Sequence, residues 1–396
     1  MNNDNQHIPS GYKPSPLGPI PEDWEVKRLG DLCFDIFSGS NKTRIDSGKY
    51  TVYGSTGVIG KTDEYKYEGE RILVARVGAH AGQVSIASGK YDVSDNTIIV
   101  ENQDCYSLYF AYQYLISSNL NKMVFGSGQP LITAGMLKRM FVVYPPFEEQ
   151  LKINNVLQLW DTAIAKQTAL IEQLTLRKRG LMQQLLTGKK RLKGFEGEWK
   201  EVRLGEIGVF FKGGGVPKDS IISAGHKCLT YGDLYTKYDY VIFDVKSYID
   251  DDTANESVKI QYGDICFAGS GETKEEIGKC AAFIDDVEAY AGGDILILRT
   301  DQEQCSDIFL GFLLNMPIAA NQKAAKGQGD AVVHISKEAL SNINCLFPSK
   351  EEQQAIASVL TSMDNELSAL EAKRKKYEQI KRGMMRQLLT GRIRLN

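Results

Sequence analysis

The sequence lacks the features of membrane, secreted and metal-binding proteins. It contains no run of about 18 apolar residues, so it predicts no membrane span. Residues 1–20 include no apolar stretch like that of a secretory signal, and we expect a polar, proline-rich arm there. The seven cysteines include no CxxC pair and the four histidines show no ligand spacing, which predicts reduced thiols, no metal site and a cytoplasmic location.

Catalytic motifs are also missing. The chain has no GxGK-type phosphate loop, no dinucleotide-binding glycine pattern and no carboxylate cluster of the metal-nuclease kind. Residues 144–147, Tyr-Pro-Pro-Phe, resemble the (N/D/S)PP(Y/F) signature of amino-methyltransferases, but tyrosine does not suit a first position that must accept the amine proton. The nearest glycine-rich segment, 125–128, ends shortly before this motif, too close to it for a nucleotide-binding half to lie between. We therefore expect neither an enzyme nor a bound cofactor.

An internal repeat is the strongest signal that the sequence contains. Residues 148–192 align without a gap to residues 351–395 (351 − 148 = 203), and 19 of the 45 aligned pairs are identical. A weaker similarity pairs Trp24 with Trp199 at the smaller offset of 175 (199 − 24 = 175). The difference between the two offsets means that the second globular part is longer than the first. The chain is therefore predicted to be a tandem duplication.

Composition and repeat together divide the chain into segments. The apolar content of 42% and charged content of 24% are those of a soluble globular protein, and 396 residues are too many for one ordinary core. We predict an N-terminal arm, a globular part, a long helix, a second globular part and a second long helix. Their ranges are 1–20, 21–147, 148–193, 194–349 and 350–396.

Both repeated segments are predicted to be long helices, because apolar residues recur at 4-3 spacing over more than four heptads. The predicted seam of the first helix is Ile153, Leu157, Trp160, Ile164, Ile171, Leu174, Leu181 and Leu185, and that of the second is Ile356, Leu360, Met363, Leu367, Leu370, Tyr377, Met384 and Leu388. Proline precedes each helix, acidic residues fill each first turn, and Thr-Gly ends each. A helix over 148–186 is about 58 Å long at 1.5 Å per residue.

A single heptad seam needs a partner, and the other helix of the chain is the simplest one. An antiparallel coiled-coil pair with a pseudo-two-fold axis is expected to place each globular part near one end of the pair. The alternative is that both helices are independent oligomerisation arms; their matching length and register favour the intrachain pair. Gly180 and Gly383 indicate either a close helix approach or shared ancestry. The polar interruptions that can fix the register are Gln167, Lys178, Arg374 and Lys381.

The globular parts combine short β-type runs with shorter helical stretches, an α+β pattern with mainly antiparallel sheets. Glycine-rich loops carry hydroxyl, amide and basic side chains that can approach, read and hold a nucleic acid. These loops are 38–44, 53–57, 76–82, 126–130, 212–218, 230–235, 269–274 and 323–330. The candidate DNA-binding residues are Ser40, Asn41, Lys42, Arg44, Tyr53, Ser55, Thr56, Arg76, His80, Ser127, Gln129, Lys212, Lys218, Tyr231, Ser270, Lys274, Lys323, Lys326 and Gln328. Taken singly, each loop also fits an ordinary surface turn; the duplication favours ligand binding for the set.

With these features the chain resembles the specificity subunits of type I restriction–modification systems. The resemblance lies in the alternation of variable part and helix, and in an opening W…LG that begins at Trp24. It continues in PPxxEQ…I over 145–153 and in the helix end MxQLLTG(K/R)xRL over 182–192, each with a similar second copy. Residues 53–82 also resemble the first target-recognition domains of that family. The resemblance covers nearly the whole chain, and the helix ends are its specific part.

The resemblance implies a non-catalytic, DNA-reading protein. Each target-recognition domain is expected to read a few base pairs of one half of a split site in double-stranded DNA. Because the two domains differ, the site is expected to be asymmetric. The two helices are expected to set the spacing and to bind two methyltransferase subunits, which carry S-adenosylmethionine. Restriction–translocase subunits are expected to complete the complex, with no role for a membrane.

Charge alone does not predict DNA binding. The two helical segments are basic, with net charges of +5 (9 − 4) and +4 (10 − 6), but the first globular part is near neutral (13 − 14 = −1) and the second is acidic (14 − 25 = −11). A DNA binder that acts alone usually shows a basic domain, so we expect the methyltransferase partners to neutralise many phosphates. The runner-up is a coiled-coil scaffold whose globular domains bind proteins and not DNA.

Overall fold

The computed structural model describes residues 8–123, 131–216 and 220–395. Its contacts divide the chain into two compact units, Met1–Ala169 with Glu371–Asn396 (unit 1) and Leu170–Leu370 (unit 2). Each unit therefore holds one globular part and a section of both long helices. The sequence instead predicts a division of the chain into separate globular and helical segments. Within the described ranges, no helix combines the length and the apolar character needed to cross a membrane.

Unit 1 contains two four-stranded sheets, of order β4-β11-β8-β9 and β6-β5-β10-β7, and the pairs β1-β2 and β3-β12. All its strand pairs are antiparallel except β5 with β10. Its strands are β1 (Tyr12–Lys13), β2 (Ile20–Pro21), β3 (Glu25–Arg28), β4 (Cys33–Ser38), β5 (Tyr50–Gly54), β6 (Gly57–Thr62), β7 (Tyr67–Glu68), β8 (Arg71–Ala75), β9 (Val84–Ala87), β10 (Lys90–Val93), β11 (Thr97–Asn102) and β12 (Phe141–Tyr144). Its short helices are η1 (Leu29–Leu32), α1 (Leu108–Ser117), η2 (Leu120–Met123) and α2 (Ala134–Arg139).

Unit 2 repeats this plan with a five-stranded sheet, β14-β23-β19-β21-β16, a four-stranded sheet, β17-β15-β22-β18, and the pairs β13-β25 and β20-β24. Its strands are β13 (Lys200–Arg203), β14 (Gly208–Lys212), β15 (His226–Leu229), β16 (Val241–Ile242), β17 (Ser247–Ile249), β18 (Val258–Ile260), β19 (Ile265–Ala268), β20 (Ser270–Gly271), β21 (Cys280–Phe283), β22 (Ala289–Ala291), β23 (Ile295–Thr300), β24 (Val333–His334) and β25 (Asn344–Phe347). Its short helices are η3 (Leu204–Glu206), α4 (Tyr231–Thr236), α5 (Asp251–Glu256), α6 (Asp307–Leu313), α7 (Pro317–Lys326) and α8 (Lys337–Ser341). The parallel pair β15-β22 corresponds to β5-β10 of unit 1.

The strand β8 shows why the core of unit 1 has two layers. Ile72 and Val74 pack in the same cluster as Phe110 of α1, whereas Leu73 packs with Tyr91 of the second sheet. Alternate side chains of a strand point to opposite faces, so a strand covered on both faces reads as a continuous apolar run. The mainly antiparallel α+β fold that the sequence predicts is confirmed in both units.

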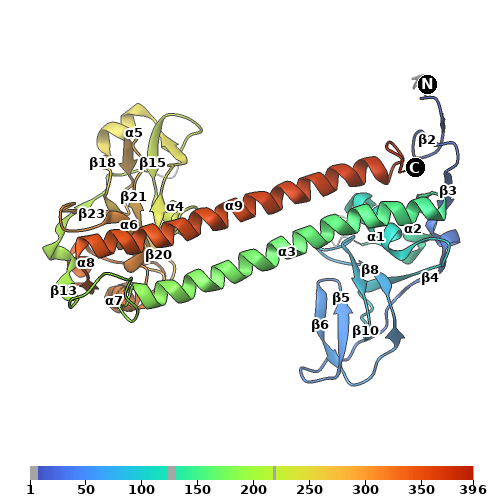
Figure 1. Ribbon diagram of the computed structural model, residues 1–396, viewed down its shortest axis with the longest axis horizontal. Helices are drawn as coiled ribbons and strands as arrows, with labels where there is room; N and C mark the ends of the chain where they lie inside the picture. The colour runs from blue at the N-terminus through green and yellow to red at the C-terminus, as the bar shows by residue number, and fades with distance from the viewer. Residues whose placement is uncertain (1–7, 124–130, 217–219, 396) are drawn as a thin grey trace. The chain divides into compact units, whose positions relative to one another are not determined.

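Two long helices, α3 (Phe147–Leu185) and α9 (Lys350–Leu388), have 39 residues each. Within each unit they run side by side, α3 in green and α9 in red in Figure 1. All sixteen predicted seam residues are buried or half-buried. In unit 1 the rings of Trp160 and Tyr377 meet across the pair, with centroids 5.5 Å apart. The predicted coiled-coil pairing is confirmed within each unit.

Charged side chains fix the helix pairing in unit 1. Lys381 Nζ lies 2.6 Å from Asp161 Oδ1, and the Arg394 guanidinium donates to both carboxylate oxygens of Glu149, at 2.6 and 2.7 Å. These hydrogen bonds raise the pKa of Arg394 above its usual value. The residue number falls along α9 as it rises along α3, so the pair is antiparallel.

Unit 2 carries the same two ion pairs at the equivalent positions of the repeat. Lys178 pairs with Asp364, and Arg191 binds Glu352 through two hydrogen bonds of 2.6 Å. The Lys178 ammonium also lies 4.7 Å from the ring centroid of Tyr240. Ion pairs that are largely buried add little net stability but penalise every other register, because a shifted helix would leave a charge unpaired.

The ends of the seams belong to the globular cores as well as to the helix pair. Ile153, Leu157 and Leu388 join the larger core of unit 1, and Leu185 and Leu360 join that of unit 2. The helices are therefore anchored where they meet the globular parts.

A glutamine near the start of each long helix ties that helix to a short one. Gln150 accepts the backbone N–H of Ser107, which precedes α1, at 2.8 Å, and Gln353 accepts that of Ser306, which precedes α6, at 3.0 Å. These bonds give the glutamine of the PPxxEQ pattern a structural role in both units.

The two helix-interior glycines do not mark a close approach between helices. Apart from the adjacent backbone of its own helix, a Cβ built at Gly180 or at Gly383 meets no atom of the described chain within 4 Å. The interpretation of these glycines as packing residues is therefore wrong, and their equivalent positions fit shared ancestry.

Candidate nucleic-acid interface

Three predicted loops of unit 1 meet at the turn 94–97, between β10 and β11 (the unit 1 turn). The N–H of Ser94 donates to the Tyr53 carbonyl at 2.9 Å. The N–H groups of Gly39 and Arg76 donate to carbonyl oxygens of the turn, also at 2.9 Å each. The structure thus gathers loops that are far apart in the sequence into one surface, as a ligand site requires.

Gly39 shows how tightly this surface is built. A Cβ at this position would lie 2.4 Å from the carbonyl oxygens of Val93 and Ser94, a distance that real Cβ atoms do not adopt. The chain must therefore be glycine here for the 38–44 loop to lie against the turn.

The side chains around the unit 1 turn are largely available to a ligand. The predicted residues with exposed side chains are Ser40, Lys42, Arg44, Thr56 and His80. Tyr53 and Ser55 are half-buried, as is Arg76, whose Nη1 donates to the Asp95 carbonyl at 3.2 Å. Cationic and hydroxyl groups at one rim can hold phosphates and read base edges.

Asn41 is a correction to the predicted set. Its side chain is 8% exposed, and its Nδ2 donates to Asp92 Oδ2 at 2.7 Å. Asp92 in turn accepts the N–H of Val93 at 2.8 Å, so Asn41 holds the loop against the sheet and does not present its amide to solvent. Two further predicted residues, Ser127 and Gln129, lie outside the described residues.

Unit 2 builds an equivalent surface at the turn 292–295, between β22 and β23 (the unit 2 turn). The N–H of Gly292 donates to the Leu229 carbonyl at 2.9 Å, as Ser94 does to Tyr53. The N–H groups of Gly213 and Gly269 donate to carbonyl oxygens of the turn, at 2.8 and 2.7 Å. The same three connections therefore organise both units, although the side chains differ.

A pocket of about 370 Å³ beside the unit 2 turn brings predicted residues from separate loops together. Lys212, Lys326 and Gln328 line it, along with Asp294 of the turn and His334 of β24. Two ammonium groups, an amide and an imidazole on one concave surface can contact both phosphates and base edges.

Two predicted residues of unit 2 serve the fold. Lys323 is 2% exposed and its Nζ donates to the Gly278 carbonyl at 2.6 Å, and burial lowers the pKa of this lysine. Ser270 is 3% exposed, and its Oγ lies 2.8 Å from His334 Nδ1, which ties β20 to β24. The prediction that these two side chains contact DNA is wrong, because neither is presented at the surface.

The remaining predicted residues of unit 2 occupy different surroundings. Tyr231, the first residue of α4, is 43% exposed, and α4 follows directly after β15, whose Leu229 carbonyl binds the turn. Lys274 is exposed in the segment between β20 and β21. Lys218 lies outside the described residues.

Sequence reasoning missed the turns themselves. Asp95 and Asn96 in unit 1, and Asp294 in unit 2, sit at the centre of the gathered loops. The available signal was the polar Ser-Asp-Asn-Thr segment, 94–97, between two buried strands. Within the described ranges, no group of three or more His, Cys, Asp or Glu side chains could hold a metal ion.

Comparison with known proteins identifies the family to which this fold belongs. A family model described as the type I restriction modification DNA specificity domain matches residues 21–176 and again 196–382. The chain belongs to that family. The double match agrees with the duplication, because each copy takes in one globular part and most of the long helix that follows it.

Members of the type I specificity family match along nearly the whole chain. The MjaVIII specificity subunit of Methanocaldococcus jannaschii is 27% identical over 409 residues, covering 95% of this chain and 94% of the relative. The putative MjaX specificity subunit of the same organism is 27% identical over 434 residues, covering 97% of each chain.

Two solved structures share the fold. The S subunit of a type I restriction–modification system from M. genitalium aligns with a TM-score of 0.62 at 17% identity, covering 92% of this chain and 96% of that one. A chain from a structural study of complex assembly and conformational transition of the type I system aligns with a TM-score of 0.58 at 14% identity, covering 94% and 99%. At these identities the likeness concerns the fold.

Proposed function

We propose that this chain is the non-catalytic DNA-recognition subunit of a type I restriction–modification complex, and that each unit reads one half of an asymmetric, bipartite site. The proposal rests on one observation above all. The two units build their turns with the same three backbone connections and surround them with different side chains. A shared backbone with different side chains suits two readers of different base sequences.

The long helices are the proposed docking site for two methyltransferase subunits. Their sequences are the repeated part of the chain, and their segments carry net charges of +5 and +4. Two copies of one partner need two similar surfaces, which the repeat supplies. In this assembly S-adenosylmethionine is held by the methyltransferase, and restriction subunits join to cut unmethylated DNA.

The charge distribution supports DNA binding by the assembly and not by the subunit alone. The second globular part has a net charge of −11, which opposes an approach to phosphates. We expect tight, salt-sensitive binding of duplex DNA only after the methyltransferase is added. The alternative hypothesis is a scaffold whose globular parts bind proteins and not DNA. It predicts that the globular parts add no DNA binding after the methyltransferase is added.

All seven cysteines are free thiols, which suits the reducing cytoplasm where the proposed DNA target lies.

An exchange of globular parts tests the bipartite proposal. Residues 21–147 are replaced by the equivalent segment of a relative with another specificity, and methylated sites are read by sequencing host DNA. The exchange is expected to change one half of the methylated site and to leave the other half intact. The matched control, an exchange of residues 194–349, is expected to change the opposite half. A change in both halves after either exchange contradicts independent reading.

A further inference from the structure

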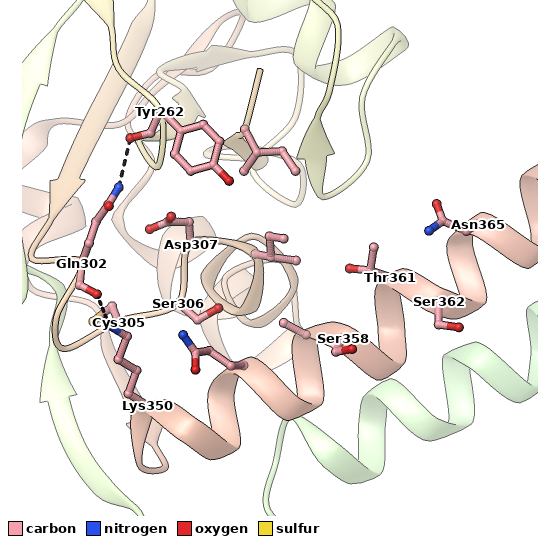
Figure 2. A pocket seen from close by; sticks show the side chains of 14 residues that line it. Tyr262, Gln302, Cys305, Ser306, Asp307, Lys350, Ser358, Thr361, Ser362 and Asn365 are labelled. Carbon is pink, nitrogen blue, oxygen red and sulfur yellow. Dashed lines mark hydrogen bonds between the residues drawn. The ribbon is translucent and has the colours of Figure 1, made fainter. Parts of the chain in front are cut away.

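A second pocket of unit 2 lies between the first half of α9 and the globular part, away from the unit 2 turn. Its volume is about 630 Å³. Figure 2 shows Tyr262, Gln302 and Asp307 on the globular side of the pocket and a row of polar side chains on the α9 side. We call it the Asp307 pocket. The polar residues that α9 contributes to it are Lys350, Gln354, Ser358, Thr361, Ser362 and Asn365.

The pocket contains a carboxylate for which the described residues supply no close ion pair. Asp307 Oδ1 is buried, and the Thr300 hydroxyl is the neighbouring hydrogen-bonding group that favours its charged form. The cation of the pocket, Lys350, donates to the Gln302 carbonyl at 2.5 Å. A partly buried carboxylate without a close cation costs free energy, and a cation from outside the chain would lower that cost.

Unit 1 shows that the fold does not need an acid at this position. Ser107 and Ser306 both precede a short helix and bind the equivalent glutamines Gln150 and Gln353, so the next residues, Leu108 and Asp307, are equivalent. A leucine there satisfies the structure without a charge. The aspartate of unit 2 is therefore not required by the fold that the two units share.

The α9 side of the pocket differs from α3 in the same way. Phe147, Leu151 and Leu159 of α3 are exposed apolar residues, and the repeat offset of 203 pairs them with polar residues of α9. Those partners are Lys350, Gln354 and Ser362, all of which line the Asp307 pocket. The two units thus offer surfaces of different chemistry at equivalent places.

We propose that the Asp307 pocket receives a cationic side chain, lysine or arginine, of the methyltransferase subunit that docks on unit 2. This inference rests on the proposed function. An unpaired carboxylate attracts a cation, and the acidic character of the second globular part, −11 in net charge, favours a basic protein surface and repels DNA phosphates. The equivalent place on unit 1 carries Leu108 and no acid, so this ion pair is formed on unit 2 alone.

The titration of Asp307 supports this role. Burial is the main cause that raises the pKa of Asp307 to about 6; the Asp264 carboxylate acts in the same direction, and the Thr300 hydroxyl and the Lys350 ammonium oppose it. The carboxyl is therefore an anion at neutral pH and becomes neutral in mild acid. Binding through this pocket is expected to weaken as the pH falls below 6.

The test measures the affinity of the purified methyltransferase subunit for the full-length chain. Asp307→Asn keeps the size of the side chain and removes its charge. We expect the dissociation constant of the site on unit 2 to rise on the order of tenfold or more, since a desolvated charge pair is broken. Asp286→Asn, which removes an exposed acid of the same unit, is the matched control and is expected to change it less than about twofold.

The outcomes separate the two levels of the proposal. If the wild-type chain binds no methyltransferase, the proposed function fails. If it binds and Asp307→Asn binds as tightly, or if both aspartate variants weaken binding equally, the pocket inference fails while the function stands. Thermal unfolding of Asp307→Asn excludes misfolding as a cause, and loss of the pH dependence in this variant, with dependence below pH 6 in the wild type, supports the inference.

Discussion

At one equivalent position beside the turns, unit 1 has an arginine, Arg76, and unit 2 has a glycine, Gly269, with the same backbone hydrogen bond. The N–H of Arg76 donates to Asn96 at 2.9 Å in unit 1, and the N–H of Gly269 donates to Asp294 at 2.7 Å in unit 2. A guanidinium beside one turn and open backbone beside the other give different contacts to DNA, since arginine reads guanine and glycine allows close approach.

Removing the guanidinium of unit 1 tests whether it contacts bases. Arg76→Ala is expected to weaken specific DNA binding by the methyltransferase complex by about 1–3 kcal/mol, the range of a good side-chain-to-base contact. The measurement is a titration of duplexes carrying the correct site or one with the unit 1 half scrambled. Arg139→Ala, which removes an exposed arginine at the end of α2, is the control and is expected to leave the discrimination intact. Equal losses on both duplexes would assign Arg76 to phosphate contact.

The titration of Asp307 also predicts how stability depends on pH. Burial raises the pKa of this carboxyl from 3.8 to about 6, so the folded chain holds the proton more tightly than the unfolded chain. Its contribution is therefore full below about pH 4 and is lost as the pH rises through 6. At pH 7.5 Asp307→Asn is expected to be more stable than the wild type by about 1 kcal/mol, a value discounted because the side chain is half-exposed.

Urea unfolding at pH 4 and pH 7.5 checks this expectation. The two proteins should unfold at similar urea concentrations at pH 4 and separate at pH 7.5, with the variant the more stable. An equal difference at both values of pH would show that the charge of Asp307 is not responsible.

The loops of the candidate site could be recognised from the sequence, but the direction of single side chains could not. Glycine and hydroxyl-rich segments predicted the surfaces around both turns. Lys323 and Asn41 turn inward to hydrogen-bond with Gly278 and Asp92. These partners are 45 and 51 residues away in the chain. Such long-range contacts have no local signature, so the composition of a loop predicts a surface and not its contact residues.

Among the elements, the long helices were the most predictable part, and their pairing shows why. The heptad spacing predicts that one face of each helix is buried, and the seam residues on that face are buried or half-buried in both units. The ion pairs could also have been found, because Asp161 and Lys178 recur unchanged as Asp364 and Lys381. Identity across a repeat at charged seam positions is a signal for paired charges.

The glycines inside the helices are expected to weaken them. Apart from the adjacent backbone of its own helix, a Cβ at Gly180 or Gly383 meets nothing within 4 Å in the described chain, and neither glycine has a positive φ. Gly180→Ala and Gly383→Ala are therefore each expected to stabilise the chain by about 0.5–1 kcal/mol, through a smaller loss of backbone entropy on folding. The measurement is the free energy of unfolding in urea.

A matched control comes from a glycine that the fold requires. Gly39→Ala, where a Cβ would lie 2.4 Å from backbone oxygens, is expected to destabilise unit 1. If the helix variants lower stability as Gly39→Ala does, the helices contact something at these positions after all.

At the scale of the whole molecule, unit 1 is closed by a contact between Trp24 and Gly391, which lie far apart in the sequence, whereas unit 2 makes the same contact within one short segment. A Cβ at Gly391 would lie 3.2 Å from the Trp24 ring, and one at Gly188 would lie 3.4 Å from the Trp199 ring. Both glycines have positive φ, 70° and 68°. In Figure 1 the red end of α9 lies beside the blue N-terminal segment, where Tyr12 Oη donates to the Gly391 carbonyl at 2.7 Å.

This equivalence predicts that the chain tolerates circular permutation. Joining Asn396 directly to Pro19 leaves a connection between Gly391 and Trp24 (392–396 and 19–23) that is as long as the one between Gly188 and Trp199 (189–198). New ends fit between the exposed residues 196 and 197. The permutant keeps every helix and strand of unit 2 and both Arg–Glu pairs, so it is expected to fold and to direct methylation to the same site.

A chain that lacks only residues 1–18 is the control for the permutant, because both lose the bond from Tyr12. We expect the two to unfold at the same temperature and, with the methyltransferase, to methylate the same sequences in host DNA. Unit 2 makes its glycine–tryptophan contact without any segment equivalent to the arm, so the arm is not needed for closure. If the permutant fails to fold while the truncated chain folds, the connection at 189–198 does more than close unit 2. The two units would then not be structurally equivalent at this connection.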